Sequence, residues 1–209
     1  MLNVFAIKPL LNIFLKFFEL VFWLNFIFCG SSLANELPTW LIDAEASSLK
    51  AIASADGTQI VVNFPIIHGE LSLQKDDLVH SFLNVKIDIA SLTTDSKDNQ
   101  ILLLSPLFFL SDKFPTAIFH SQNILWLKDQ FQITGNLELN GISHQVMINV
   151  EIHQPDKKAN SQTTAVGTAK IQRLDFNIGT GEWADTASLK NEVDISFTCT
   201  LAIQILSFS

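Results

Sequence analysis

The stretch FQITGNLELNGISHQVMINVEI, residues 131–152, decides the fold class of this 209-residue chain. Apolar and polar residues alternate on both sides of Asn140-Gly141, a dipeptide that strongly favours a two-residue β-turn. A strand buries every second side chain, whereas an amphipathic helix buries side chains three or four apart. The stretch therefore predicts an antiparallel hairpin with one apolar and one polar face.

The same alternation recurs on either side of this hairpin. It is clearest over residues 83–90 and 194–203. Further strands are expected at about 48–54, 59–67, 69–75, 117–127 and 162–172, with shorter pieces around Trp40–Ile42 and Phe176. Helix is expected only near residues 99–104 and for one turn after Ser105, and residues 155–161 are expected to form a solvated loop. The fold class is predicted as all-β, an antiparallel eight-stranded barrel with a short helical segment.

The first 34 residues are predicted to be a cleaved signal peptide, with residues 35–209 as one barrel domain. Lys8 gives a weakly basic start, residues 10–28 are mostly apolar, and Ser32 and Ala34 have the spacing that a signal peptidase reads. An uncleaved membrane anchor is the alternative, because the apolar run approaches the ~20 residues needed to span a bilayer. With cleavage, we expect an exported protein without stable membrane insertion.

Charge and cysteine content narrow the classes of partner. The leader contains two lysines and one glutamate, so 11 basic and 20 acidic residues follow it. This excess of negative charge argues against nucleic acid and against anionic membrane surfaces as partners. Cys199 is the one cysteine after the leader, so no intramolecular disulfide is expected and the core must stabilise the fold.

No motif in the sequence indicates an enzyme. The five histidines, His68, His80, His120, His144 and His153, have no metal-binding spacing. The sequence also contains neither a Gly-x-Ser-x-Gly elbow nor a glycine-rich phosphate loop. We therefore expect no catalytic residue and no metal site. A hydrolase with a scattered catalytic set is the remaining enzymatic alternative, and a Ser–His pair in a cleft would support it.

The segment SPLFFLSDKFPTAIF, residues 105–119, fits neither periodicity. It places four phenylalanines around two prolines and a Ser-Asp-Lys turn. Leaving four rings exposed would be costly, so the segment must lie against an apolar surface. We interpret it as a lid over one end of the barrel.

An eight-stranded barrel can be filled by its own side chains or can hold one ligand, and the sequence leaves both open. Thr163, Ala165, Gly167 and Ala169 share one parity, and they leave space if that parity faces inward. Cys199 lies on the apolar face of its strand and is expected to be a small buried residue rather than a reactive thiol.

Arg173 is the only arginine in the chain. Its fork of donors suits the oxygens of a diphosphate or a quinone carbonyl, so it is a candidate for binding a polar head group. A salt bridge to Asp175, Asp185 or another acid is the alternative.

Five motifs in sequence resemble those of the YceI-like polyisoprenoid-binding family, over roughly residues 40–203. They are Trp40-Leu41-Ile42-Asp43 with Ser48; Val85-x-Ile87-Asp88-x-x-Ser91-Leu92-x-Thr94; Pro-x-Phe-Phe … Phe-Pro-x-x-x-Phe within residues 106–119; Gly135-x-Leu137-x-Leu139-x-Gly141; and Arg173-Leu174-Asp175-Phe176-Asn177-Ile178-Gly179. Lys97, Leu107, Leu110, Asn177 and His144-Gln145 depart from the family pattern. Asn177 replaces a glycine, and asparagine also tolerates a left-handed backbone.

The resemblance implies a lipocalin-like barrel whose apolar lumen binds an isoprenoid chain. It also implies export to the periplasm, often a homodimer, and no enzymatic activity. The implied ligand is an isoprenoid lipid or isoprenoid quinone, with no other cofactor. The expected ligand-binding residues are Val85, Ile87, Leu137, Val146, Ile148, Phe197 and Cys199 along the tube, Phe108, Phe109 and Phe176 where it closes, and Arg173 at the head group.

A second hypothesis is a ligand-free structural or interaction module associated with a membrane redox system. A collapsed lumen and an exposed apolar patch would favour it.

Overall fold

The structure is a computed structural model, and it describes residues 38–154 and 162–203. The predicted signal peptide, residues 1–34, and the predicted loop at 155–161 lie outside the described residues. Within the described ranges no helix is both long enough and apolar enough to cross a bilayer.

Antiparallel strands make up most of the described chain. They are β1 (Trp40–Ala55), β2 (Thr58–Phe64), β3 (Ile67–Ser72), β4 (Phe82–Asp88), β5 (Thr116–Leu127), β6 (Gln130–Leu139), β7 (Ile142–His153), β8 (Thr163–Gln172) and β9 (Glu192–Ile203). One α-helix, α2 (Lys97–Leu104), and three short 3-10 helices, η2 (Ile89–Ser91), η3 (Arg173–Phe176) and η4 (Gly181–Ala184), connect them.

The sheet closes on itself because β1 pairs with β9 as well as with β2 and β3. β2 and β3 follow the same edge of β1 one after the other, and they are separated by Pro65, which has no N–H to donate to a ladder. Counted as one interrupted strand, they complete a ring of eight. The predicted eight-stranded antiparallel barrel is confirmed.

The long first strand corrects the expectation of two separate pieces at Trp40–Ile42 and 48–54. β1 is continuous and contains a bulge between Asp43 and Ser48, where its register against β9 shifts. Side chains satisfy the bulge: Asp43 Oδ1 accepts from Glu45 N at 3.1 Å, and Ser47 Oγ accepts from Thr200 N at 3.0 Å. The bulge breaks the alternation, which is why the sequence pattern looked interrupted there.

Two shorter predictions have different outcomes. The helix expected at 99–104 is confirmed as α2, and the Ser96 hydroxyl caps it by accepting from Asn99 N at 3.1 Å. The short strand expected around Phe176 is wrong, because Phe176 ends η3. Asn177 then adopts the left-handed backbone that stops this helix, with φ of 53°.

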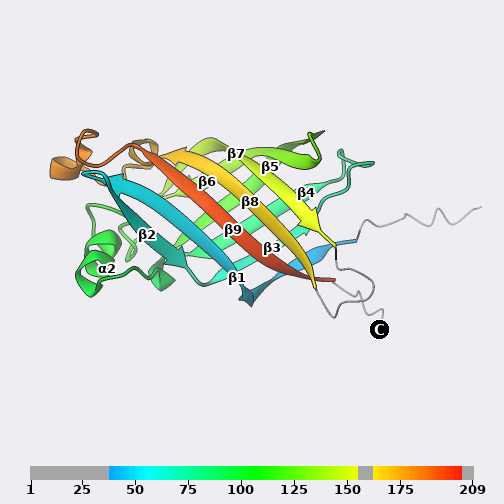
Figure 1. The fold of residues 1–209 in the computed structure, drawn as a ribbon, viewed down its shortest axis with the longest axis horizontal. Helices are drawn as coiled ribbons and strands as arrows, with labels where there is room; N and C mark the ends of the chain where they lie inside the picture. Colours follow the sequence, from blue (N-terminus) through cyan, green and yellow to red (C-terminus); the bar gives the residue numbers. More distant parts are fainter. Residues whose placement is uncertain (1–37, 155–161, 204–209) are drawn as a thin grey trace, which may run out of the picture. The chain divides into compact units, whose positions relative to one another are not determined.

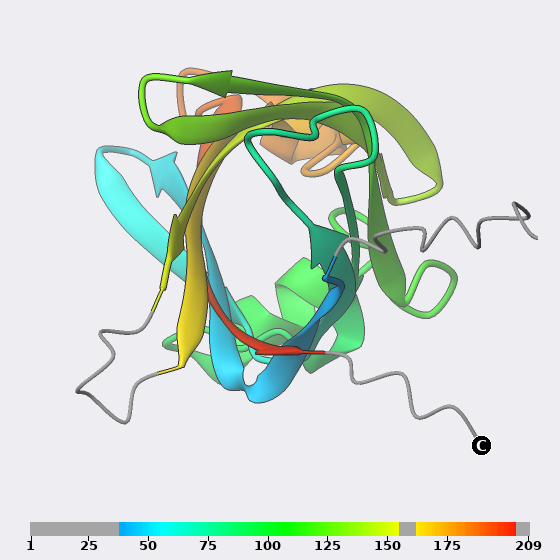
Figure 2. The same cartoon turned by 90° about the vertical axis from the view of Figure 1, so that its right-hand side faces the viewer.

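The connections divide the barrel into two unlike ends (Figure 1). We call one the closed end, and define it as α2, residues 105–114 and residues 173–191, which cluster at the left of Figure 1. At the opposite end β1 begins, β9 ends, and the β3–β4 and β5–β6 connections lie. Figure 2 looks along the barrel from this second end.

Candidate functional site

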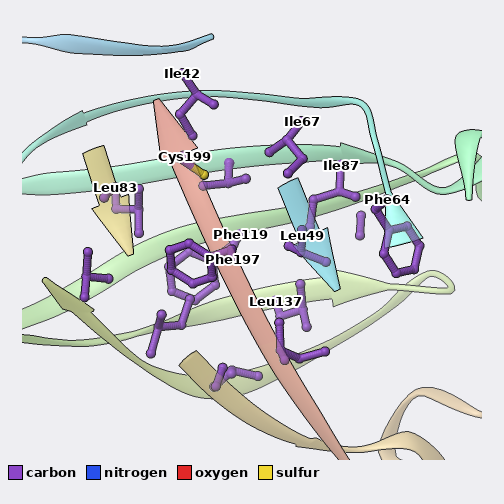
Figure 3. A pocket seen from close by; sticks show the side chains of 18 of the residues that line it. Ile42, Leu49, Phe64, Ile67, Leu83, Ile87, Phe119, Leu137, Phe197 and Cys199 are labelled. Carbon is purple, nitrogen blue, oxygen red and sulfur yellow. The ribbon is translucent and has the colours of Figure 1, made fainter. Parts of the chain in front are cut away.

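An apolar cavity of about 130 Å³ lies inside the barrel. Its walls consist of alanine, valine, leucine, isoleucine, phenylalanine and cysteine side chains that come from all around the ring of strands (Figure 3). The period of two along each strand accounts for this composition, since it sends alternate apolar residues inward. The arrangement suits a ligand that needs burial rather than hydrogen bonds.

The small residues of β8 face the cavity and leave it space. Ala165 and Ala169 line it, and Gly167 faces inward between them, because a Cβ there would overlap the ring of Phe197. On another part of the wall, a Cβ at Gly135 would lie 2.5 Å from Cζ of Phe119. The two rings thus occupy the places that larger residues at the glycines would fill.

All seven residues predicted to lie along the tube line this cavity. They are Val85, Ile87, Leu137, Val146, Ile148, Phe197 and Cys199. Alternation around clear strands was the signal that identified them. The prediction missed lining residues such as Leu49, whose parity is hidden by the bulge in β1, and Phe64, at the end of β2. Whether these side chains bind a ligand stays a prediction.

The aromatic residues expected to close the tube lie behind the cavity wall. Phe109 packs edge-on against Phe64, a lining residue, with ring centroids 6.0 Å apart. Phe108 is buried against Trp183, with centroids 5.7 Å apart. Phe176 is buried against the ring of His144 at 5.3 Å. These three residues therefore form a plug at the closed end rather than part of the lining.

The side-chain amide of Asn140 links two of the segments that form this plug. Asn140, in the β6–β7 turn, donates from Nδ2 to the carbonyl of Phe176 at 3.0 Å and to that of Phe108 at 3.3 Å. The turn that the sequence predicted from Asn140-Gly141 thus also anchors the 105–114 and 173–191 segments to the barrel.

Arg173 is buried, and its guanidinium donates five hydrogen bonds to backbone carbonyls. Nε donates to Lys190 O at 3.0 Å, and the two terminal nitrogens donate at 2.7–2.8 Å to the carbonyls of Ile178, Gly179, Trp183 and Leu189. Burial lowers the pKa of Arg173 from its ordinary value. With five donors used and the side chain only 2% exposed, nothing remains to grip a head group. The salt-bridge alternative is also corrected, since carbonyls and not Asp175 or Asp185 are its partners.

Cys199 is buried in the cavity wall. Burial raises the pKa of its thiol to about 11, and a hydrogen bond with Ser47 opposes this effect only in part. At neutral pH the thiol is protonated and acts as a small apolar group.

The charged and polar side chains that could perform chemistry lie elsewhere. The His80 ring bonds Asp77 at 2.9 Å and the His120 ring bonds Asn84 at 3.0 Å, both on the surface. Across residues 38–154 and 162–203 there is no group of three or more His, Cys, Asp or Glu side chains arranged to hold a metal ion.

Comparisons with known proteins point to one family. A family model described as a YceI-like domain matches residues 40–201. The chain is 28% identical to a UPF0312 protein of Photorhabdus laumondii over 134 residues, which cover 63% of this chain and 68% of that protein. It is 26% identical to the protein YceI of Escherichia coli O157:H7 over 156 residues, covering 67% and 80%.

Solved structures have the same fold. BcnA of Burkholderia cenocepacia superposes with a TM-score of 0.70 and 25% identity, covering 77% of this chain and 99% of BcnA. A domain from Saccharophagus degradans, described as polyisoprenoid binding and implicated in plant cell wall breakdown, superposes with a TM-score of 0.59. That match has 16% identity and covers 80% of this chain and 99% of the domain, so it is a likeness of fold.

Proposed function

The chain belongs to the YceI-like family, and from this membership we propose that it is an exported, non-catalytic carrier or sequestering protein. Its cargo is a polyisoprenoid or a similar long apolar lipid held inside the barrel. The observation that carries the proposal is the apolar lining of the cavity.

The energetics of that lining favour a hydrocarbon chain. Each methylene moved from water into such a site contributes about 0.8 kcal/mol. A polar group placed there would lose its hydrogen bonds to water and gain none from the walls, at a cost of roughly 1–3 kcal/mol. The lining therefore selects for the tail of a ligand and against its head.

The size of the cavity limits how much of the tail it takes. An engineered apolar cavity of about 150 Å³ binds benzene, so a cavity of 130 Å³ holds about six carbon atoms. This corresponds to about one isoprene unit. A longer chain must displace side chains such as Phe119 or Phe197, or extend out of the cavity.

The description of another protein with the same fold supports the proposed ligand class. The Saccharophagus degradans domain with the same fold is described as polyisoprenoid binding. An isoprenoid quinone carries the same kind of chain and belongs to the same proposal, with no further cofactor. Export to the periplasm is proposed from the leader-like residues 1–34 and the family resemblance, and a homodimer from the resemblance alone.

The test is extraction of lipid from protein purified from its native host with its own leader. Mass spectrometry of the organic extract should find an isoprenoid lipid in near-stoichiometric amount. Ala165→Phe, which fills the cavity, should lose most of it. The matched control is Val166→Phe, because residue 166 is the next position of β8 and faces outward.

Two results would contradict the carrier proposal. One is wild-type protein that carries no apolar molecule, and the other is equal lipid content in the two variants. The first would favour the ligand-free interaction module, and the second would place the lipid outside the cavity.

A further inference from the structure

The barrel wall is incomplete between β7 and β8. The two strands pair only from Ile148–Ala169 to His153–Thr164. Beyond the first of these pairs, residues 142–147 of β7 pair with β6 alone, and residues 170–172 of β8 pair with β9 alone. Within the described part of the chain, no ladder pairing joins the two strands over this stretch, so they diverge toward the closed end.

The gap is bounded on both sides. The Ile148–Ala169 pair is its edge toward the middle of the barrel. At the closed end, Phe176 of η3 is buried and packs against His144 of β7, with ring centroids 5.3 Å apart. What remains is a window in the side of the barrel rather than an opening at its end.

A hollow on the outer surface, with a volume of about 480 Å³, extends over this window and across β8 and β9 to Ile52 of β1. Met147 and Asn149 of β7 and Thr168 and Lys170 of β8 line it. Ala169 and Ile195 line both this hollow and the inner cavity, although their strand positions face inward. These two residues are partners in the continuous β8–β9 ladder, so the way from the hollow to the cavity is the window, where Met147 and Lys170 stand outside and Val146 and Ile171 inside.

The two ends of the barrel offer less direct access to the cavity. The plug of Phe108, Phe109 and Phe176 covers the closed end. Toward the other end, Trp126 packs on Phe131 with ring centroids 4.7 Å apart, and Phe131 is buried. Bulky side chains thus stand near both ends, whereas at the window no ladder pairing among the described residues closes the wall.

The outer hollow has polar groups that the cavity does not have. Asn149 Oδ1 is shielded from solvent and has no hydrogen-bond partner within the described residues. An unpaired buried acceptor is unfavourable, and a ligand hydroxyl beside it would remove that cost.

The charges at the hollow disfavour an anionic head group. Lys170 Nζ is paired with Glu192 and, at 3.0 Å, with Asp194. Two carboxylates against one ammonium leave one net negative charge beside Asn149. A diphosphate would be repelled, and its requirement for free cationic donors would not be met.

We propose that this window is a lateral portal, through which the chain of the lipid passes between β7 and β8, past Val146 and Ile171, while an uncharged head group with a hydroxyl stays outside beside Asn149. The inference rests on the proposed function and assigns it a ligand class, namely prenyl alcohols rather than prenyl diphosphates.

The route is tested by closing the window from outside. N-phenyl-1-naphthylamine, an uncharged apolar fluorophore, is mixed with the full-length protein in a stopped-flow instrument, and farnesol displacement identifies the signal from the cavity. Thr168→Trp should slow uptake about tenfold. Val166→Trp, two residues away on the same outer face, should change it less than twofold. Met147→Trp, on the other side of the window, is a second variant with the same expected effect as Thr168→Trp.

The head group is tested with two ligands that share one tail. Farnesol should displace the fluorophore at least ten times more effectively than farnesyl diphosphate. Asn149→Leu should weaken farnesol binding about fivefold, whereas Asn123→Leu, at an exposed position of β5, should not. Equal displacement by the two ligands would overturn the assignment of the head group.

The outcomes separate this inference from the proposed function. If farnesol binds and the Thr168→Trp and Met147→Trp variants load as fast as Val166→Trp, the portal is wrong and the carrier function stands. If the wild type binds neither farnesol nor the fluorophore, the carrier function fails and the portal fails with it.

Discussion

The ring of Phe197 occupies the position that a Cβ at Gly167 would take, and the two residues are direct partners in the β8–β9 ladder. The glycine lets an aromatic side chain lie inside the barrel without pushing the strands apart. The ring of Phe119 likewise lies where a Cβ at Gly135 on β6 would go, although the ladder partner of Phe119 is Leu137. Two aromatic rings thus enter the cavity from β5 and β9, and they limit the length of chain that fits.

Gly167→Ala should therefore lower the free energy of unfolding by about 1–3 kcal/mol, as overpacked cores do. In a Phe197→Ala background the additional loss caused by Gly167→Ala should be smaller but not zero, because the new Cβ would still lie 2.6 Å from the carbonyl of Asn149. Urea denaturation of the two single variants and the double variant measures the coupling. Strictly additive effects would contradict the contact.

Phe197→Ala alone should change which chain length binds best. Removing the ring enlarges the cavity, so the preference should shift from geraniol toward geranylgeraniol in fluorophore displacement. Stability should fall by about 3–5 kcal/mol.

Phe108→Ala is the matched control, because Phe108 is equally aromatic and buried but lies in the plug. It should destabilise the fold and leave the chain-length preference unchanged. This differs from a lid over the ligand, for which Phe108→Ala would weaken lipid retention more than folding. Loss of retention in a folded Phe108→Ala protein would restore the lid interpretation.

Arg173→Lys should destabilise the protein by roughly 2–5 kcal/mol. Lysine has three donors, so at least two of the five carbonyls around Arg173 would lose their partner, at about 1–3 kcal/mol each. Farnesol affinity per folded molecule should stay the same. Lys190→Arg, at an exposed position, is the control. A stable Arg173→Lys protein that no longer binds lipid would instead indicate a head-group role.

The thiol of Cys199 should make stability depend on alkaline pH. Its pKa is about 11 in the folded protein and lower in the unfolded chain, so the unfolded state loses this proton first as pH rises. Below about pH 8.5 the thiol is protonated in both states, and the contribution of its burial to stability is fully present. Between about pH 8.5 and pH 11 the thiol ionises in the unfolded chain first, so the free energy of unfolding falls. Urea midpoints at pH 8 and pH 10 should fall more for the wild type than for Cys199→Ala. Equal falls would show that the thiol is not buried in this way.

The sequence could predict the tube because alternation is a local property of each strand. Parity placed Val85, Ile87 and Val146 on the apolar faces of their strands without knowledge of which strands pair, and the family resemblance made those faces the lumen. The bulge at Asp43–Ser48 defeated the same reasoning in β1, since it shifts parity within one strand.

Features that depend on pairing between distant strands could not be predicted. The partners of Arg173 are carbonyls, which every residue has, so no residue pattern distinguishes them from a salt bridge or a ligand. The window between β7 and β8 depends on where one ladder stops, and both strands continue past that point. Only the assembled barrel reveals either feature.

Arg173 and Asn140 anchor the plug at one end of the barrel, so the two ends of the barrel are not equivalent. In the proposed carrier, a barrel closed at this end would let the lipid leave only by the route through which it entered. The part of the molecule that enters first is the last to come out. The tail of the lipid would lie deepest in the barrel, and its head group would stay at the entrance. The head group would therefore be the first part of the lipid to reach the recipient.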